Sequence, residues 1–371
     1  MTGAARILTV NAGSSSLKLR LLGPDDEVLA TRDGAPGEDP DSLREELRRI
    51  LDAGPAPDAA AHRVVHGGAA FDRATAIDAG VEDALARLAE LAPLHNPQAV
   101  RAIRALTEVR PDLPDVACFD TAFHAGLPAA ARTYAVPAAW TGGGGEPLRR
   151  YGFHGLSHAY ASRRAAELLG APAAELRLVT AHLGAGASLA AVAGGRSVDT
   201  TMGFTPLEGL VMATRAGSVD PGLLLWVQRH HGLDPDETER ALDREAGLLG
   251  LAGTADMREI VAAAARGEER PALALDVYVH RLAASIAAMA AAMGGLDALV
   301  FTGGVGENAP AVRERACAAA GFLGVGLDPA RNERGAPDTV LSPPGTAVAV
   351  VLVAAREDVE MARQARELLG A

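Results

Sequence analysis

The sequence predicts an α/β protein with mixed sheets, built from two halves of related architecture. Hairpin patterns dominate the start of the chain, whereas strands alternate with helices further along, and this mixture is typical of mixed sheets. A short apolar strand, a turn of small residues and a second strand occur in this order at residues 7–22 and again at 176–192. The 371 residues, 49% of them apolar and 22% charged, suffice for roughly two to three domains with a core.

The first half is expected to begin with a hairpin. Residues 7–10 are an apolar strand, and residues 17–22 alternate between leucine and basic side chains, which is the period of a strand with one buried face. Further elements follow in order: a helix at 43–51, a strand at 62–65 that ends at Gly67 and Gly68, and helices at 81–91 and 97–107, the second with Pro97 in its first turn and Asn96 as its cap.

The rest of the chain alternates between strands and helices. Apolar runs predict strands at 116–119, 176–181, 188–192, 298–302 and 348–353. Helical spacing predicts helices at 160–169, 221–231, 237–245, 273–293 and 357–369.

Charge and composition exclude several classes of partner. The net charge of −12 argues against a nucleic acid or an anionic membrane surface. No secretory signal is evident, and no apolar stretch of about 18 residues is free of charges and helix breakers, so no membrane span is expected. The alanine-rich run 282–293 indicates a buried helix. Cys118 and Cys317 have neither disulfide-framework nor zinc-ligand spacing, which points to the reducing cytoplasm.

Three glycine-containing turns follow apolar strands, at residues 11–16, 184–188 and 303–308. Glycine lets backbone N–H groups approach phosphate oxygens, and such turns form anion-binding nests, to which serine hydroxyls add donors. A single turn of this kind is more often an ordinary tight turn, whereas three after strands favour a phosphate site. The P-loop pattern is absent, and residues 303–308 fit the dinucleotide-binding pattern poorly.

Polar side chains stand in apolar surroundings, close to the ends of several predicted strands and in the loops between them. A lone histidine in such a setting is more often structural, but several near glycine and aromatic residues indicate a site. Neither HExxH nor another recognised metal-ligand spacing occurs. The residues concerned are Arg63, His95, Asp120, His124, His154, His158 and Arg215.

With these residues in place, the chain resembles the acetate kinases, which belong to the superfamily of acetate and sugar kinases, heat-shock chaperones and actin. The resemblance covers nearly the whole chain and rests on ordered matches that include NAGSSSLK (11–18), HRVVHGG (62–68), FDTAFH (119–124), YGFHGLSH (151–158), HLGAGAS (182–188) and FTGGVGEN (301–308). It implies two actin-like (ribonuclease H-like) domains, residues 1–123 plus 359–371 and residues 124–358, with the active site in the cleft between them and most nucleotide contacts on the second domain.

The resemblance also implies roles for individual residues. Asn11 and Glu357 would hold Mg²⁺, with Mn²⁺ as a substitute. The catalytic residues would be Arg63, His95, Asp120, His154 and Arg215, and the acyl pocket would be Arg63, Val65, Leu94, Phe153 and Pro206. The ATP- or ADP-binding residues would be Asn11, Ser14, Ser16, Lys18, His182, Gly184, Ala185, Gly186, Asp256, Met257, Arg258, Gly304, Val305, Gly306 and Asn308.

The expected reaction is reversible, in-line transfer of a phosphoryl group from ATP to acetate, giving acetyl phosphate and ADP. Such a site needs cations more than a base, because a carboxylate is already ionised at pH 7 and repels the polyphosphate. Two arginines, a histidine and Mg²⁺ meet that need. The family also implies a homodimer, and the two domains are expected to close around the substrates.

Ala185 is the main departure, since the family usually has asparagine at this position. The loss of that donor predicts a lower rate or an altered nucleotide preference. Two alternatives retain the fold: a kinase for propionate or another short-chain acid, because a methylene changes burial by only about 0.8 kcal/mol, and a degenerate nucleotide-binding paralogue. An actin- or chaperone-like ATPase is disfavoured, because the Arg63, His154 and Arg215 set would have no purpose there.

Overall fold

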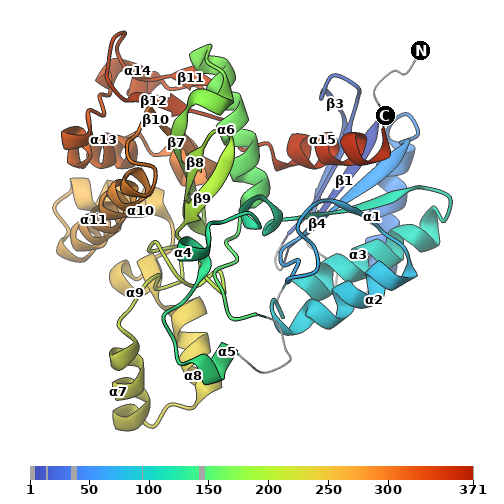
Figure 1. Ribbon diagram of the computed structural model, residues 1–371, viewed down its shortest axis with the longest axis horizontal. Helices are drawn as coiled ribbons and strands as arrows, with labels where there is room; N and C mark the ends of the chain where they lie inside the picture. The colour runs from blue at the N-terminus through green and yellow to red at the C-terminus, as the bar shows by residue number, and fades with distance from the viewer. Residues whose placement is uncertain (1–4, 14–15, 35–39, 94, 142–146, 371) are drawn as a thin grey trace.

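The computed structural model contains two mixed sheets of six strands, joined into two layered halves (Figure 1). It describes residues 5–13, 16–34, 40–93, 95–141 and 147–370. The strand order is β3-β2-β1-β4-β6-β5 in the first sheet and β11-β12-β10-β7-β8-β9 in the second. The strands of the first sheet are β1 (Ile7–Ala12), β2 (Leu17–Leu22), β3 (Val28–Gly34), β4 (Ala59–Val64), β5 (Thr75–Ala76) and β6 (Asp115–Phe119). Those of the second are β7 (Arg177–Leu183), β8 (Ala187–Ala193), β9 (Arg196–Thr200), β10 (Ala298–Thr302), β11 (Thr339–Val340) and β12 (Ala349–Leu352).

The two sheets repeat one topology. In the first, β1 pairs antiparallel with β2 and parallel with β4; in the second, β7 pairs antiparallel with β8 and parallel with β10. Beyond the hairpin, each sheet has one further antiparallel strand, β3 in the first and β9 in the second. On the other side a parallel strand follows, β6 or β12, and then an antiparallel edge strand, β5 or β11. The expectation of two related halves with mixed sheets is therefore confirmed.

Helices cover both faces of the first sheet. On one face α1 (Pro40–Asp52) and α3 (Asn96–Val109) pack Leu47 and Leu106 against the leucines of β1 and β2. The opposite face is covered by α15 (Glu357–Leu369), whose Val359 and Ala362 are buried against β1, β4 and β6. The C-terminal helix thus returns to the half in which the chain began, as Figure 1 shows.

The second sheet lies between α6 (Gly155–Leu169) on one face and α11 (Glu269–Ala292) with α13 (Pro310–Ala319) on the other. Among the described helices, α11 alone is long and apolar enough to cross a membrane by length and composition. Its Tyr278, Leu282 and Ile286 are buried in the largest core cluster, whereas Ala284, Ala288 and Ala291 are exposed. The helix expected to be buried is therefore buried on one face only.

The remaining helices connect these layers or lie at the edges: α2 (Ala79–Arg87), α4 (Ala129–Arg132), α5 (Ala138–Thr141), α7 (Pro221–His231), α8 (Pro235–Arg240), α9 (Gly247–Ala252), α10 (Met257–Ala265), α12 (Gly303–Asn308) and α14 (Pro329–Arg334). Short 3₁₀ turns lie at Leu88–Glu90, Ala122–His124, Ala173–Glu175 and Gly321–Leu323, and a π turn at Ala241–Glu245.

Three local expectations were wrong. Asn96 is not a cap: it is the first residue of α3, and its buried amide accepts from the backbone N–H of His66 and donates to the His66 carbonyl. Residues 303–308 form the helix α12 instead of a turn, entered through Gly303 at φ +81°. The helix expected at 237–245 changes at Arg240 into the π turn.

Candidate active site

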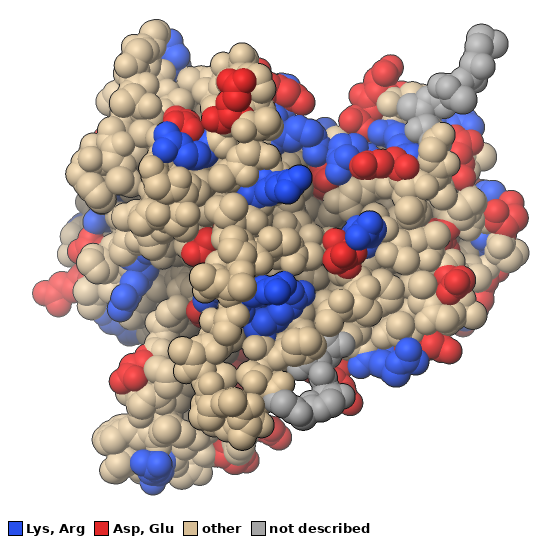
Figure 2. Space-filling view, viewed as in Figure 1, with Lys and Arg blue, Asp and Glu red and all other residues tan. Residues whose placement is uncertain are grey.

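A cavity of about 690 Å³ opens between the two halves. It is lined by the β1–β2 hairpin, by Arg63 of β4, by the β7–β8 hairpin, and by the first residues of α6, α12 and α15. A second cavity of about 730 Å³ shares Ala185 and Gly304 with it, so the two are neighbours. On the face that Figure 2 shows, basic and acidic side chains are interspersed.

Arg63 is held in the first cavity by two partners. Its Nε lies 3.2 Å from both carboxylate oxygens of Asp120, its Nη2 donates to Asp120 Oδ2 at 2.6 Å, and its Nη1 donates to Asn11 Oδ1 at 3.3 Å. The Asp120 side chain is 2% exposed and that of Arg63 19%. Burial lowers the pKa of Arg63, but Asp120 and Glu357 more than compensate, so the guanidinium stays charged and fixed in orientation.

His154 stands where α6 begins, in the left-handed backbone region at φ +56°. Its Nδ1 lies 2.9 Å from Ser188 Oγ, and its ring stacks on His182 with 4.4 Å between centroids. Burial, with the nearby His182 and Arg63, holds the pKa of His154 well below its ordinary value. The imidazole is therefore neutral at pH 7. In this state one ring nitrogen carries a proton and can donate a hydrogen bond to an anion.

Arg215 belongs to the same half as His154 and approaches the His154 ring from another segment of the chain. Its Nε donates to Asp243 Oδ1 at 2.9 Å, and its Nη1 lies 3.4 Å from the Pro206 carbonyl. A Cβ added at Gly186 would lie 3.2 Å from the His154 ring and 3.6 Å from Arg215 Nη1. The glycine tip of the β7–β8 hairpin thus passes between the histidine and the arginine, where a side chain would crowd both.

His95 lies beside Arg215 and Asp243 in a third cavity of about 480 Å³. Burial lowers the pKa of His95 to about 4, and Arg63 and Arg215 contribute to this shift. The predicted catalytic residues Arg63, His95, Asp120, His154 and Arg215 are therefore near one another, although they come from five separate segments of the chain.

Glu357 and Asn11 both line the first cavity, together with Lys18. Burial raises the pKa of Glu357, but Arg63, His182 and Lys18 outweigh it and hold the pKa below its ordinary value, so the carboxylate is charged. A carboxylate and an amide oxygen are ligands that Mg²⁺ accepts when phosphates and waters complete its shell. Within the described part of the chain, no group of three or more His, Cys, Asp or Glu residues could hold a metal by itself. This donor set fits Mg²⁺ brought in with a nucleotide.

The second cavity contains most of the residues expected to hold the nucleoside. It is lined by Gly184, Ala185, Asp256, Met257, Arg258, Gly304, Val305 and Asn308, with Leu248, Tyr278 and others. Asp256 caps α10 by accepting from the Arg258 backbone N–H at 2.8 Å. The Asn308 amide donates to the Gly304 carbonyl at 2.8 Å, which fixes the wall on the α12 side.

Some predicted residues lie elsewhere or cannot be placed. Ser14 and Leu94 fall outside the described residues. Gly306 is buried, and a Cβ there would lie 3.7 Å from Leu183 Cβ, an ordinary van der Waals contact between α12 and β7. Ser16 and His182 line the first cavity.

The predicted acyl pocket is only partly assembled in the structure. Phe153 is buried in the core, and Val65 is partly buried against the same cluster. Pro206 reaches Arg215 through its carbonyl oxygen. None of the three lines the cavities described above.

Sequence reasoning missed residues that position the predicted ones. Asp243 orients Arg215 from the π turn, 28 positions along the chain, and no local pattern marks it. Ser188 is buried and bridges His154 to His158, with its Oγ 2.9 Å and 2.8 Å from their ring nitrogens. The histidine spacing at 154 and 158, one helical turn apart, could have suggested a shared partner.

Comparison with known proteins agrees with this arrangement. The model of the acetokinase family matches residues 46–363. The chain is 46% identical to the acetate kinase of Clavibacter sepedonicus over 397 aligned positions, which cover 98% of this chain and 99% of that protein. It is 50% identical to the acetate kinase of Synechococcus sp. (strain JA-2-3B'a(2-13)) over 309 positions, covering 83% of this chain and 76% of the relative.

Solved structures are similar over the full length. The acetate kinase of Porphyromonas gingivalis has a TM-score of 0.90 at 36% identity, covering 99% of this chain and 100% of that one. A propionate kinase from Francisella tularensis subsp. tularensis SCHU S4 has a TM-score of 0.89 at 34% identity, covering 97% and 98%. The two-domain, actin-like α/β fold expected from the sequence is confirmed by these likenesses.

Proposed function

Because the chain belongs to the acetokinase family, we propose that it transfers a phosphoryl group from ATP to acetate, forming acetyl phosphate and ADP in a reversible, in-line reaction. The observation that carries the proposal is the position of His154, which lies beside Arg215 at the glycine tip (Gly186) and lines the first cavity together with Arg63. Three donors, two of them cationic, meet where a phosphoryl group would lie between a nucleotide and a small acid.

Arg63, Arg215 and His154 each contribute to neutralising the negative charge of the phosphoryl group. Arg63 and Arg215 are held by Asp120 and Asp243 and offer their remaining N–H groups to the equatorial oxygens of the phosphoryl group. His154, kept neutral by burial, donates a further hydrogen bond. Such donors stabilise the spread negative charge of the transition state, and one arginine can contribute about 10³-fold or more in rate.

In this proposal the nucleotide and the metal occupy the first and second cavities, which share Ala185 and Gly304 in their walls. The adenosine lies among Asp256, Met257 and Val305, and the phosphates reach past Ala185 toward Lys18. Asn11 and Glu357 hold Mg²⁺ or Mn²⁺, which supplies neutralisation of phosphate charge when it is bound. The exposed Ala185 offers no side-chain donor to the phosphates, so the backbone of the hairpin serves there.

The acid itself is proposed to be acetate, with propionate as the second candidate. The propionate candidate has a specific basis, since a solved propionate kinase matches this fold about as well as the acetate kinases do. Discrimination by one methylene is modest in any apolar pocket, about 1–3 kcal/mol. The residues proposed to enclose the acyl chain are Val65, Leu94, Phe153 and Pro206.

The domain boundaries are proposed at residues 1–123 plus 359–371 and residues 124–358, with the reaction in the cytoplasm. Packing of α15 on the first sheet supports the return of the chain to the first domain. The boundary between residues 358 and 359 then falls in the first turn of α15, so that Glu357 stands at the junction.

A homodimer is proposed as the assembled form. The helix α7 has no buried residue, and its Leu223, Leu225 and Trp226 are 48%, 52% and 50% exposed. Apolar exposure of this kind marks an association surface. Sedimentation of the wild-type chain and of a Leu225→Ser/Trp226→Ser variant tests this surface: a dimer that becomes a monomer supports it, and an unchanged mass rejects it.

The function is tested by trapping acyl phosphate as its hydroxamate, with ATP and Mg²⁺, across formate, acetate, propionate and butyrate. A maximum at acetate is expected, and Arg215→Ala should abolish the signal, whereas Arg266→Ala, an exposed arginine paired with Glu268, should not change it. A maximum at propionate would favour the second candidate. Absence of product with every acid would reject the kinase function and favour a nucleotide-binding paralogue.

A further inference from the structure

We propose that Arg163 and Glu360 are positioning residues, whose ion pair joins the two halves behind the active site and sets the distance between His154 and Glu357. The Arg163 Nη1 lies 2.6 Å from Glu360 Oε2. This inference rests on the proposed function for the roles of His154 and Glu357, but the contact and its placement are features of the structure itself.

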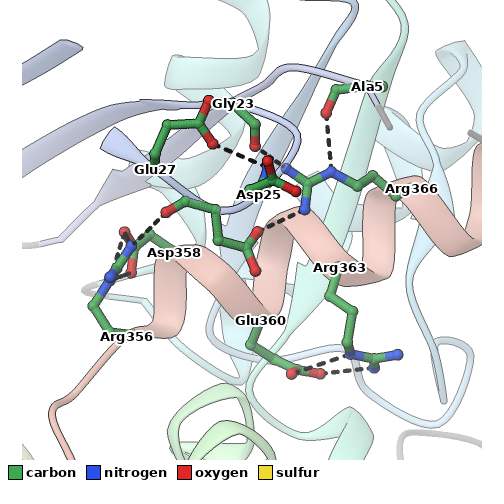
Figure 3. Close-up of polar contacts among 10 residues, drawn as sticks. Ala5, Gly23, Asp25, Glu27, Arg356, Asp358, Glu360, Arg363 and Arg366 are labelled. Carbon is green, nitrogen blue, oxygen red and sulfur yellow. Dashed lines mark hydrogen bonds and ion pairs between the residues drawn. The ribbon is translucent and has the colours of Figure 1, made fainter. Parts of the chain in front are cut away.

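Glu360 is a buried charge with an unusually full set of partners. Its side chain is 1% exposed, and it accepts from Arg363 Nη2 at 2.8 Å and from Gln364 Nε2 at 2.9 Å in addition to Arg163. Figure 3 shows the Glu360–Arg363 part of this set on the side of α15. Burial raises the pKa of Glu360, and the arginines outweigh that effect, so the group remains a carboxylate.

The partners on its own helix would satisfy Glu360 without Arg163, since Arg363 and Gln364 lie one turn further along α15. Arg163 differs because it belongs to α6, and its side chain is 36% exposed. An arginine that reaches across to another helix and becomes ordered loses rotamer freedom. The Arg163–Glu360 contact is therefore best explained by the two helices that it connects, α6 and α15.

The two helices belong to different halves. Arg366 fixes α15 to the first half by donating to the carbonyls of Ala5 at 2.9 Å and Gly23 at 2.6 Å and to Asp26 Oδ1 at 2.6 Å. Figure 3 shows Arg366 beside Ala5 and Gly23. The helix α6 is fixed to the second half, because its Ala161 and Ala165 are buried against strands β7, β8, β10 and β12. The Arg163–Glu360 pair is thus a bond between the halves.

Both helices begin in the active site. His154 precedes the first residue of α6, and Glu357 is the first residue of α15. Glu360 lies one turn beyond Glu357, and the helices pack through Leu156 and Tyr160 of α6 against the apolar cluster that contains Val359 and Ala362. Any tilt between the helices about this contact would change the separation of the histidine and the carboxylate.

Apolar packing is non-directional, so a directional contact adds to the restraint on that tilt. A cavity of about 660 Å³ lies on the outer side of the helix pair, and Arg163, Glu360, Arg363 and Gln364 are part of its wall. Space therefore remains beside this pair, and Arg163–Glu360 is a directional contact that crosses from α6 to α15. Groups that orient metal ligands from behind typically change metal affinity or activity about 10- to 100-fold when they are removed.

The test compares Arg163→Ala with a matched variant of the same helix. Arg164 is 34% exposed and pairs with Glu167 and Asp338, both in the second half, so Arg164→Ala removes a similar arginine without touching the bond between the halves. Arg163→Lys serves as the conservative replacement, because an ammonium can still reach Glu360.

The first readout is binding of Mn²⁺ in the presence of ADP, followed by the paramagnetic resonance of free Mn²⁺, which needs no turnover. Arg163→Ala should weaken Mn²⁺ binding about 10-fold or more, Arg163→Lys should recover most of it, and Arg164→Ala should match the wild type. Thermal unfolding of both alanine variants should be similar, which separates positioning from a general loss of stability. Equal Mn²⁺ affinity in Arg163→Ala and Arg164→Ala would overturn the proposal.

The second readout is hydroxamate formation with acetate. A wild type that binds Mn²⁺ with ADP but makes no acyl phosphate would reject the proposed function while the Mn²⁺ comparison still decides the positioning role. An active wild type together with unchanged kcat and Mn²⁺ affinity in Arg163→Ala would reject the positioning role alone.

Discussion

Replacing Asp120 by asparagine removes the negative charge that pairs with Arg63 and leaves the shape of the side chain almost unchanged. The native carboxylate is 2% exposed and receives contacts at 3.2 Å, 3.2 Å and 2.6 Å from one guanidinium. An asparagine can accept with its single carbonyl oxygen, but its NH₂ group then faces the donors of Arg63 or turns into the buried interior. The arginine therefore loses both charge compensation and orientation.

The expected loss of stability follows from burial of the pair. Removal of one partner of a buried ion pair typically costs about 3–5 kcal/mol. Glu357 also acts on Arg63 and partly replaces the lost charge, so the lower end of this range, about 3 kcal/mol, is expected. For catalysis, a misplacement of about 1 Å can cost 10²-fold, and we expect a fall of that order in kcat.

Urea unfolding and hydroxamate formation at saturating ATP and acetate measure the two effects. Asp297→Asn is a suitable control, because Arg177 holds Asp297 in a similar two-pronged contact at 2.8 Å and 3.1 Å. The pair is 41% and 31% exposed and lines none of the cavities described above. The control should lose less than about 1 kcal/mol of stability and no activity. If Asp120→Asn retained wild-type kcat, Arg63 would not need its partner and the assigned geometry would be wrong.

Three further predictions concern other parts of the site. Ala185→Asn returns a side-chain donor to the hairpin tip and should lower KM for ATP about 10-fold, as expected for a hydrogen bond to a charged group of about 1.5 kcal/mol; an unchanged KM in initial-rate assays would show that the backbone suffices. Burial lowers the pKa of His95 and His124 from 6.5 to about 4. Between these values the unfolded chain binds protons that the folded chain does not. As the pH falls from 6.5 to 4, the free energy of unfolding should therefore fall by about 1.4 kcal/mol per pH unit for each histidine. Urea midpoints across that range measure the slope, and a flat profile would contradict the assignment. Asp243→Asn frees Arg215 Nε and should reduce kcat about 10-fold while changing stability by about 1 kcal/mol or less, because the pair is 20% and 25% exposed; equal kcat would count against the orienting role.

Strongly patterned elements were predictable from the sequence. The helices Pro221–His231 and Glu357–Leu369 and the strand Ala298–Thr302 agree with their expected ranges, because capping residues or an uninterrupted apolar run mark their ends. The strand Val28–Gly34 was not expected. It is an edge strand whose residues are mostly exposed, so it shows no apolar alternation, and only its pairing with β2 defines it.

The residues of the site likewise fall into those that the sequence predicts and those that it does not. Residues in conspicuous settings, such as Arg63 among apolar strand residues or His154 between glycines and aromatics, could be found without the structure. Their partners could not, because Asp243 and Glu360 look like ordinary acidic residues of surface helices until the fold places them. Glu360 was overlooked in this way, although it is 1% exposed.

The backbone of His154 has a consequence for how this protein can change. A histidine at φ +56° occupies a conformation that glycine and asparagine adopt more readily, at a cost of order 1 kcal/mol or more. Selection for heat resistance alone would tend to replace His154, whereas selection for catalytic activity would preserve it. Libraries screened only for thermal tolerance should therefore accumulate inactive chains altered at residue 154, and the position can serve as an internal marker of which pressure a library has experienced.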